Sequence, residues 1–334
     1  MGVVRSRTAL GLLVYGLFVL LLCPVSAVAA GWQWLNPIPQ GNTLHDVWGT
    51  PSGDLFAVGS SGAIVHFDGV SWRTMDSPTR EPLAAVWGVS GTDVYAVGAN
   101  GTILHYDGTS WVPMHSGTDH HLWGVWASGP CDVFAVGGQG TILHYDGKSW
   151  NHMDVQTGKT LRGVWGISPN LVFAVGYGGT LLKYDGNAWV QENTPTRRDL
   201  VAVHGVSALD VYAVGHSGTF LRFDGVSWKE LATKTTEHLV RVRVGYDARV
   251  TACSENGAVL EYDGEKFSLA RIPCETRITG MWGMPGGRLM IVGERATMAV
   301  KDGPAFSPVT AGTSRDFHTL VPGMRDDILA VGTG

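Results

Sequence analysis

The sequence has few charged residues. Charged side chains make up 16% of its 334 residues, with 24 Lys and Arg against 29 Asp and Glu. A weakly acidic chain offers no basic surface for a phosphate backbone, and its basic residues do not cluster with aromatic ones. We therefore expect no nucleic-acid partner.

Motifs of the common enzyme classes are also missing. The sequence contains no G-x-S-x-G nucleophile motif, no phosphate-binding loop and no H-E-x-x-H zinc motif. It has four cysteines but no C-x-x-C pair, which argues against a thiolate metal site or a thioredoxin-type centre. We expect no catalytic residues, no cofactor and no metal.

Only one stretch of the chain is apolar enough to cross a membrane. Arg5 and Arg7 come before an apolar run at residues 9–22, and the small residues 26–30 follow it. This order is typical of a secretory signal peptide, residues 1–30, that is cleaved after the small residues. The alternative is an uncleaved membrane anchor. We predict an exported protein (periplasmic, secreted or at the cell surface) without a stable membrane span after cleavage.

Glycine, in contrast, is abundant, with 46 residues. So much glycine disfavours helices, because each interior glycine costs about 1 kcal/mol relative to alanine. The glycines follow no triplet period, which excludes collagen. The composition therefore indicates a strand-rich fold with many turns.

A unit of 39 residues recurs through residues 31–334 without insertion or deletion. Each unit begins with an apolar residue and contains an Asp-Gly pair, with an aromatic residue four positions after the Asp in the complete units. The complete units are residues 44–82, 83–121, 122–160, 161–199, 200–238, 239–277 and 278–316, and a partial unit combines 317–334 with 32–43. A period of this length predicts a repeat architecture that forms a single domain.

Four short runs in each unit have strand character. In the second unit they are residues 83–88, 94–98, 102–106 and 110–114, which are rich in Val, Ile, Tyr and Trp and are separated by Gly, Asp and Asn. Four antiparallel strands in each unit form one blade of an all-β propeller. We predict eight blades, with the first strand of each blade innermost.

Closure of the ring depends on the two ends of the repeat array. Residues 317–334 look like the first two strands of a blade, and residues 32–38 stand where a fourth strand is expected. Pairing them in one blade would close the ring and cover two strand edges. That blade lacks a third strand, and seven blades with loose ends are the alternative.

Large aromatic residues recur at one position of the first strand. Trp occupies it in five units, and His204 and Arg243 replace it in the fifth and sixth; the Trp residues are Trp48, Trp87, Trp126, Trp165 and Trp282. Blades must bury both faces against their neighbours, so we expect these rings to form core rather than a sugar-stacking or cofactor surface.

The segment of residues 94–111, Val-Tyr-Ala-Val-Gly through Asp-Gly-Thr-Ser-Trp, resembles the BNR (Asp-box) and photosystem-assembly-factor-like propeller repeats of bacterial secreted proteins. The resemblance covers residues 44–316 and beyond. The Asp stands four residues before the aromatic here, whereas the Asp-box has five. The resemblance implies a propeller in which the Asp forms a structural turn, and it implies no particular chemistry.

Function is expected where the units differ, in the loops that share one face of the propeller. These are the loops between the fourth and first strands and between the second and third strands. The candidate binding residues are Arg80, His120, His121, Tyr177, Arg198, His216, His238, Arg277, Glu294, Arg295 and Arg315. The alternative is a merely solvated rim.

Asp46 and Arg241 are charged at a first-strand position where the other complete units have Ala or Gly. We predict that they line the central opening, as ligand contacts or as an ion pair. Asp119, His120 and His121 form the sharpest cluster, but adjacent loop residues rarely bind one metal alone. His66, His105 and His144 recur in third strands, and we expect them to pack or hydrogen-bond between blades.

Three cysteines remain after the predicted signal peptide. Cys253 lies near the end of a second strand, and Cys274 lies in the loop that returns over the same blade. In an exported protein we predict a disulfide between Cys253 and Cys274, with Cys131 free.

These features favour an exported, monomeric, non-enzymatic propeller that binds a protein, peptide or glycan on its variable loop face. The alternative is a sialidase-like glycoside hydrolase or a metal-assisted lyase that acts at the central opening. The Arg, Tyr and Glu content permits sialidase chemistry, but no motif brings these residues together.

Overall fold

The computed structural model describes residues 44–50, 54–68, 72–244, 249–271, 278–283, 289–293, 298–302, 305–308, 317–322 and 328–332. All of them belong to the second of two units of the chain, residues 35–334. Outside the described residues lie the predicted signal peptide, the strand predicted at 32–38, and the candidate residues Arg277, Glu294, Arg295, Arg315 and Cys274.

Seven antiparallel sheets of four strands follow one another along the chain, as the repeat predicts. Blades 1 to 4 comprise β1 Leu44–Gly49, β2 Leu55–Gly59, β3 Ile64–Phe67 and β4 Trp72–Thr74; β5 Leu83–Ser90, β6 Asp93–Gly98, β7 Ile103–Tyr106 and β8 Trp111–Met114; β9 Leu122–Gly129, β10 Asp132–Gly137, β11 Ile142–Tyr145 and β12 Trp150–His152; and β13 Leu161–Ser168, β14 Leu171–Gly176, β15 Leu181–Tyr184 and β16 Trp189–Gln191. In each blade the four strands pair in chain order.

The remaining blades have the same strand order. They comprise β17 Leu200–Ser207, β18 Asp210–Gly215, β19 Phe220–Phe223 and β20 Trp228–Glu230; β21 Leu239–Val244, β22 Val250–Ser254, β23 Ala258–Tyr262 and β24 Phe267–Arg271; β25 Ile278–Gly283, β26 Leu289–Gly293, β27 Met298–Asp302 and β28 Ala305–Pro308; and a last pair, β29 Phe317–Pro322 and β30 Ile328–Gly332. Short 3-10 turns join the second and third strands of blades 1 to 5, at η1 Ser60–Gly62, η2 Ala99–Gly101, η3 Gly138–Gly140, η4 Tyr177–Gly179 and η5 His216–Gly218.

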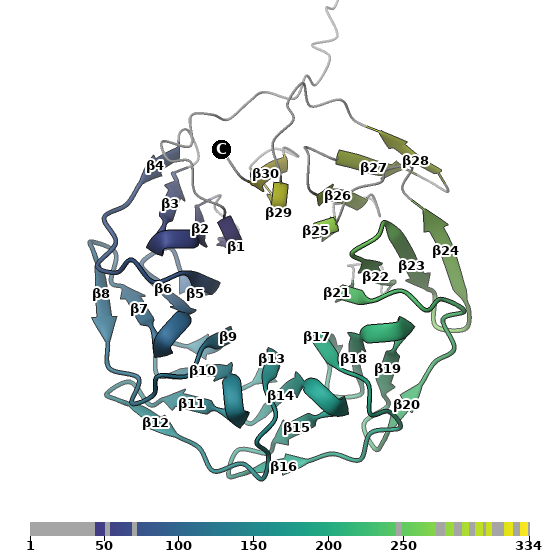
Figure 1. Ribbon diagram of the computed structural model, residues 1–334, viewed down its shortest axis with the longest axis horizontal. Coiled ribbons are helices and arrows are strands. Elements are labelled where there is room, and N and C mark those ends of the chain that lie inside the picture. The colour runs from purple at the N-terminus through teal and green to yellow at the C-terminus, as the bar shows by residue number, and fades with distance from the viewer. Residues whose placement is uncertain are drawn as a thin grey trace, which may run out of the picture. The chain divides into compact units, whose positions relative to one another are not determined.

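The first strands form the inner ring of a propeller, which confirms the predicted fold class (Figure 1). Each first strand contacts the first strand of the next blade, and β29 contacts both β25 and β1, so the ring closes through an eighth sheet. The predicted pairing of residues 32–38 with that sheet lies outside the described residues. Among the described residues, no apolar helix reaches the length that a membrane span requires.

The predicted tryptophan core joins neighbouring blades. The ring of Trp48 lies against Gly88 of the next blade so closely that a Cβ on Gly88 would stand 2.4 Å from it. Trp126 and Gly166 make the same contact, with a corresponding distance of 2.6 Å. Trp126 and Trp165 are only 5% and 9% exposed. Trp126 and Trp165 therefore belong to the hydrophobic core, and the partly buried Trp48 and Trp87 pack against it. The side chain of Trp282 lies outside the described residues.

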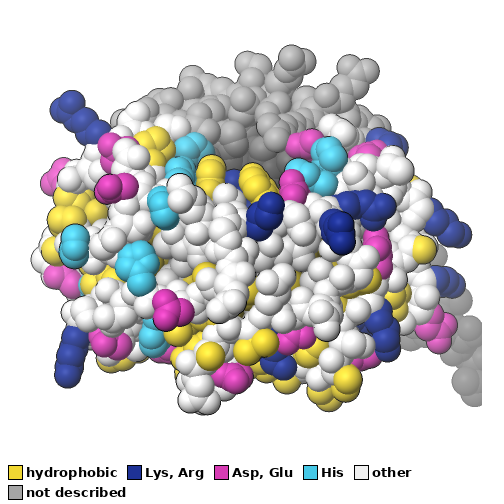
Figure 2. All heavy atoms as spheres, turned by 60° about the horizontal axis from the view of Figure 1, so that its bottom comes forward, with side chains coloured by type: hydrophobic (Ala, Val, Ile, Leu, Met, Phe, Trp, Pro, Cys, Tyr) yellow, Lys and Arg dark blue, Asp and Glu magenta, His cyan; other side chains and the backbone are white. Residues whose placement is uncertain are grey.

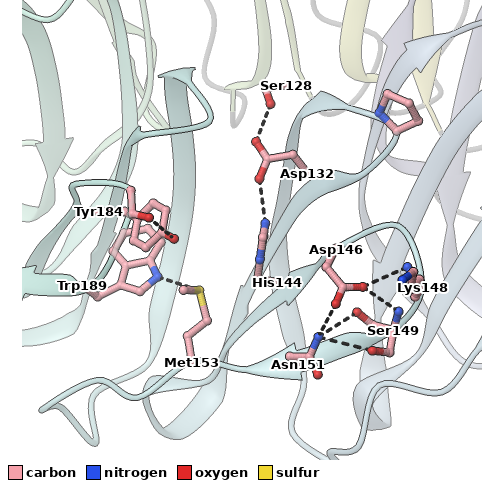
Figure 3. A network of polar contacts seen from close by, with 12 residues as sticks. Ser128, Asp132, His144, Asp146, Lys148, Ser149, Asn151, Met153, Tyr184 and Trp189 are labelled. Carbon is pink, nitrogen blue, oxygen red and sulfur yellow. Dashed lines mark hydrogen bonds and ion pairs between the residues drawn. The ribbon is translucent and has the colours of Figure 1, made fainter.

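The Asp-Gly pairs form turns between the third and fourth strands. In blade 3, Asp146 Oδ1 accepts hydrogen bonds from the backbone N–H groups of Lys148 and Ser149, each at 2.9 Å (Figure 3). These two bonds hold the pKa of the Asp146 carboxyl below its ordinary value. Gly147 has φ +88°, a conformation that favours glycine. The Asp residues of this motif are therefore structural, as the resemblance implies.

The third-strand histidines bond within their own blades, so the expectation of bonds between blades was wrong. His144 Nε2 lies 2.6 Å from Asp132 Oδ1, at the start of the second strand (Figure 3). The imidazole of His144 also stacks on Phe134, with ring centroids 4.5 Å apart. His105 makes the same pair of contacts in blade 2, with Asp93 and Tyr95. These contacts tie the second and third strands of one blade together.

Candidate functional site

Each first strand contains a β-bulge directly after its leading apolar residue. In blade 3, Leu122 pairs with Gly137 and Gly124 pairs with Val136, so Trp123 is the extra residue between them. A bulge of this kind re-aims a side chain away from the regular alternation of the strand. The bulged residues are His45, Ala84, Trp123, Arg162, Val201, Val240, Thr279 and His318. They include His, Ala, Trp, Arg, Val and Thr, whereas the leading apolar position is Leu in six of the eight units.

Two of these bulged residues meet on the inner ring. The guanidinium carbon of Arg162 lies 4.0 Å from the ring centroid of Trp123 in the preceding blade. His121, two residues before Trp123, stacks on the same ring with a centroid separation of 3.8 Å. Tyr177 on η4 and Arg241 on β21 act on the pKa of Arg162 through their charges, which raise and lower it respectively. We call His121, Trp123, Arg162, Tyr177 and Arg241 the inner-ring cluster.

The inner-ring cluster is positively charged. Burial lowers the pKa of the Arg162 guanidinium, and the positive charge of Arg241 acts in the same direction. Among the described residues, Arg162 has no ion pair, and the hydrogen bond of Arg241 goes to the neighbouring carbonyl of Val240 at 3.0 Å. An arginine that is partly withdrawn from water without a counter-charge is well placed to receive an anion.

His121 adds an unsatisfied polar atom to the cluster. Its Nε2 is buried and has no hydrogen-bond partner within the described part of the chain. Burial lowers the pKa of the imidazole, and the charge of Arg162 acts in the same direction. A ligand atom that reached this nitrogen would supply its missing hydrogen bond.

The first-strand histidine and aspartate of blade 1 have structural contacts. Asp46 Oδ2 accepts a hydrogen bond of 2.9 Å from the backbone N–H of Val86 in blade 2. His45 lies 2.8 Å from the carbonyl of Leu83 through Nδ1 and 3.1 Å from the hydroxyl of Ser60 through Nε2. Asp46 thus ties blade 1 to blade 2, whereas Arg241, its predicted companion, belongs to the inner-ring cluster.

The other described candidate residues belong to the loops that precede the first strands and to η5. Figure 2 shows histidines and charged side chains distributed over the surface in that view. His120 Nδ1 lies 2.7 Å from the hydroxyl of Thr141, so His120 and His121 have different partners. His216 and His238 have ring centroids 4.4 Å apart. Arg198 forms an exposed ion pair with Glu230 at 2.9 Å, and Arg80 is exposed. These residues do not converge on one point.

Metal-binding geometry does not arise among the described residues, where no three His, Cys, Asp or Glu side chains are grouped to hold an ion. Cys131 is an exposed free thiol, and Cys253 is a buried free thiol whose pKa burial raises to about 12. Cys274 lies outside the described residues, so the disulfide between Cys253 and Cys274 stays a prediction.

Sequence reasoning missed Trp123 and Arg162, the two central residues of the cluster. It singled out the position of Asp46 and Arg241, one residue further along the strand. The signal was available, because the preceding position holds His45, Ala84, Trp123 and Arg162 in successive units and varies more in side-chain size than its neighbours. What the sequence does not reveal is the bulge that gives this position its direction.

The fold and the cluster define a β-propeller with a cationic and aromatic inner ring. No protein-family model and no curated protein matches the chain. Among solved structures it is similar to YCF48 bound to D1 peptide (15% identity, 77% of this chain and 92% of that chain, TM-score 0.60). It is also similar to YCF48 from Cyanidioschyzon merolae (15%, 76% and 94%, TM-score 0.59) and to the C-terminal WD40 domain of Sif2 (11%, 87% and 93%, TM-score 0.69). At these identities the likeness shows the propeller fold alone.

Proposed function

We propose that this chain is an exported propeller that binds a segment of another protein, a peptide in extended or loop form, at the inner-ring cluster. The observation that carries the proposal is the contact between Arg162 and Trp123. Arg and Trp are enriched among the residues that dominate protein–protein binding energy. Both residues stand on bulges of the inner ring, in two blades that present the same face.

The contacts of Trp123 favour a peptide over a glycan. A sugar binds by lying on an open aromatic face, whereas the ring of Trp123 is already in contact with His121 and Arg162. A peptide needs a polar anchor beside an apolar surface, and the cluster has both. One of the similar structures, YCF48, was solved with a bound peptide, which supports the same kind of ligand for this chain.

The proposal can be tested by photo-crosslinking in cells that produce the full chain. A photoreactive phenylalanine analogue would replace Ala84, the bulged residue of β5 on the inner ring. The control position is Val226, which is 87% exposed in the turn between β19 and β20, on the opposite face. We expect a discrete protein adduct from position 84 that disappears when Trp123→Ala is added, and none from position 226. Equal adducts from both positions, or an adduct insensitive to Trp123→Ala, would count against the proposal.

A further inference from the structure

We infer that the bound segment carries an acidic side chain, Asp or Glu, whose carboxylate is received by the guanidinium of Arg162. The inference rests on the proposed function and specifies its ligand. It follows from three features of the inner-ring cluster: an arginine without a counter-charge, a second positive charge that acts on it from β21, and an imidazole nitrogen without a partner.

The first feature is the charge of Arg162. Its guanidinium is partly withdrawn from water by the ring of Trp123 and by neighbouring strands, and burial lowers its pKa. Within the described residues its contact is with an aromatic face and not with a carboxylate. By comparison, the half-buried guanidinium of Arg222 is paired with Asp210 at 2.9 Å. A planar guanidinium left unpaired offers two parallel N–H donors to a carboxylate.

The second feature is Arg241, which brings a like charge into the same region. It stands two blades from Arg162 along the ring, and its positive charge opposes that of Arg162. This repulsion raises the free energy of the unliganded protein, and an anion bound at Arg162 offsets it. Asp199, an acidic residue in the loop before β17, is already bonded: its Oδ1 accepts the N–H of Gly178 at 2.7 Å, and its Oδ2 lies 3.4 Å from His216 Nδ1.

The third feature is His121. Its buried Nε2 lacks a partner in the described part of the chain, and the ring stacks on Trp123 beside Arg162. A carboxylate has two oxygens and about four lone-pair positions, enough to accept from the guanidinium and, in the tautomer with its proton on Nε2, from the imidazole as well. An uncharged amide of the same size would leave Arg162 without a counter-charge.

Selection of peptides on the purified full chain tests this inference. The probe is a phage-displayed library of random twelve-residue peptides, whose C-termini are fused, so that only side chains supply carboxylates. We expect the enriched peptides to share an Asp or Glu at a fixed position. A synthetic copy of the strongest binder should lose at least tenfold in affinity when that residue is changed to its amide. The variant Arg162→Gln should bind the acid and amide forms equally weakly.

The control variant is Lys148→Gln, which removes one positive charge from an exposed turn on the opposite face. It should bind the acidic peptide as the unmodified chain does, which separates local recognition from net charge. Enriched peptides without an acidic residue that still lose binding in Trp123→Ala would overturn the inference and leave the proposed function standing. Peptides insensitive to both Trp123→Ala and Arg162→Gln, or no enrichment at all, would overturn both.

Discussion

The guanidinium carbon of Arg162 lies 4.0 Å from the ring centroid of Trp123, and this contact links the first strands of blades 3 and 4 on the inner ring. A cation over an aromatic face contributes about 0.5–1 kcal/mol when exposed and ~2 kcal/mol when it is withdrawn from water. Because the contact also orients the guanidinium, its loss is expected to affect ligand binding more than stability.

Replacement of Arg162 by Lys tests the importance of that orientation. The ammonium keeps the positive charge but lacks the planar, two-pronged donor that stacks on Trp123. We expect the affinity for an acidic peptide selected on the unmodified chain to fall about tenfold, which is ~1.4 kcal/mol. Titration calorimetry measures the affinity, and urea unfolding should change by less than about 1 kcal/mol. Undiminished affinity in Arg162→Lys would mean that charge alone suffices.

The packing of tryptophan on glycine between blades leads to a second prediction. A methyl group on Gly166 would stand 2.6 Å from the ring of Trp126, so Gly166→Ala must displace the ring or the strand. We expect a loss of about 1–3 kcal/mol in the free energy of unfolding. Gly129→Ala is the matched control, because no atom lies within 4 Å of its added methyl group. Equal stabilities of these two variants would contradict the packing account.

The chain itself indicates how this clash is relieved. In blade 5 the tryptophan position holds the smaller His204, and in blade 6 the glycine position holds the larger Val244. Adding Trp126→His to Gly166→Ala should therefore recover at least about 1 kcal/mol relative to the sum of the single effects. A double-mutant cycle in urea measures this coupling, and strict additivity would show that the two positions do not share one space.

The propeller could be predicted from the sequence because its cause is local and repeated. The Asp-Gly pair of the repeat forms a turn, as Asp146 and Gly147 do in blade 3. The first-strand tryptophan of the repeat, such as Trp126, faces a small residue 40 positions later in the sequence. The inner-ring cluster could not, because regular alternation places Trp123 and Gly124 on opposite sides of a strand. The bulge that changes this arises only when β9 pairs with β10, and the partner of His144 also depends on that register.

The bond between His144 and Asp132 supports a third prediction. Asp132 Oδ1 lies 2.6 Å from His144 Nε2, and Oδ2 accepts from the Ser128 hydroxyl at 2.5 Å (Figure 3). Asp132→Leu removes both acceptors, and we expect a loss of about 1–2 kcal/mol in thermal or urea unfolding. Blade 4 has Leu171 and Lys183 at these two positions. The double replacement Asp132→Leu with His144→Lys should accordingly be more stable than Asp132→Leu alone.

If instead Asp132→Leu proved as stable as the unmodified chain, hydrogen bonds to water would fully replace the bond between His144 and Asp132, and that bond would add nothing to the free energy of unfolding. A second check uses blade 5, where Asp210 and Arg222 form the corresponding pair at 2.9 Å. Asp210→Leu should cost a similar amount, because Arg222 and the hydroxyl of Tyr212 both lose their acceptor.

His204 leads to a prediction about acid stability. Burial lowers the pKa of its imidazole to about 3, and the positive charge of Arg243 in the next blade acts in the same direction. Its Nδ1 is buried without a partner among the described residues. In the unfolded chain His204 takes up a proton below pH ~6.5, whereas the folded protein resists it. The contribution of His204 to the free energy of unfolding is therefore fully present above pH ~6.5 and decreases as the pH drops toward 3.

Between pH 7 and pH 5 this effect should lower the free energy of unfolding by about 1–2 kcal/mol. His204→Asn cannot titrate, so its stability should change less over the same interval, whatever its stability at pH 7. The comparison stops at pH 5 because, at lower pH, carboxyl groups such as that of Asp146, whose pKa is lowered, add their own pH dependence to the stability. His66 and His121 also have lowered pKa values and remain in both proteins, so they cancel. Parallel pH dependences for the two proteins would show that His204 takes up its proton without unfolding.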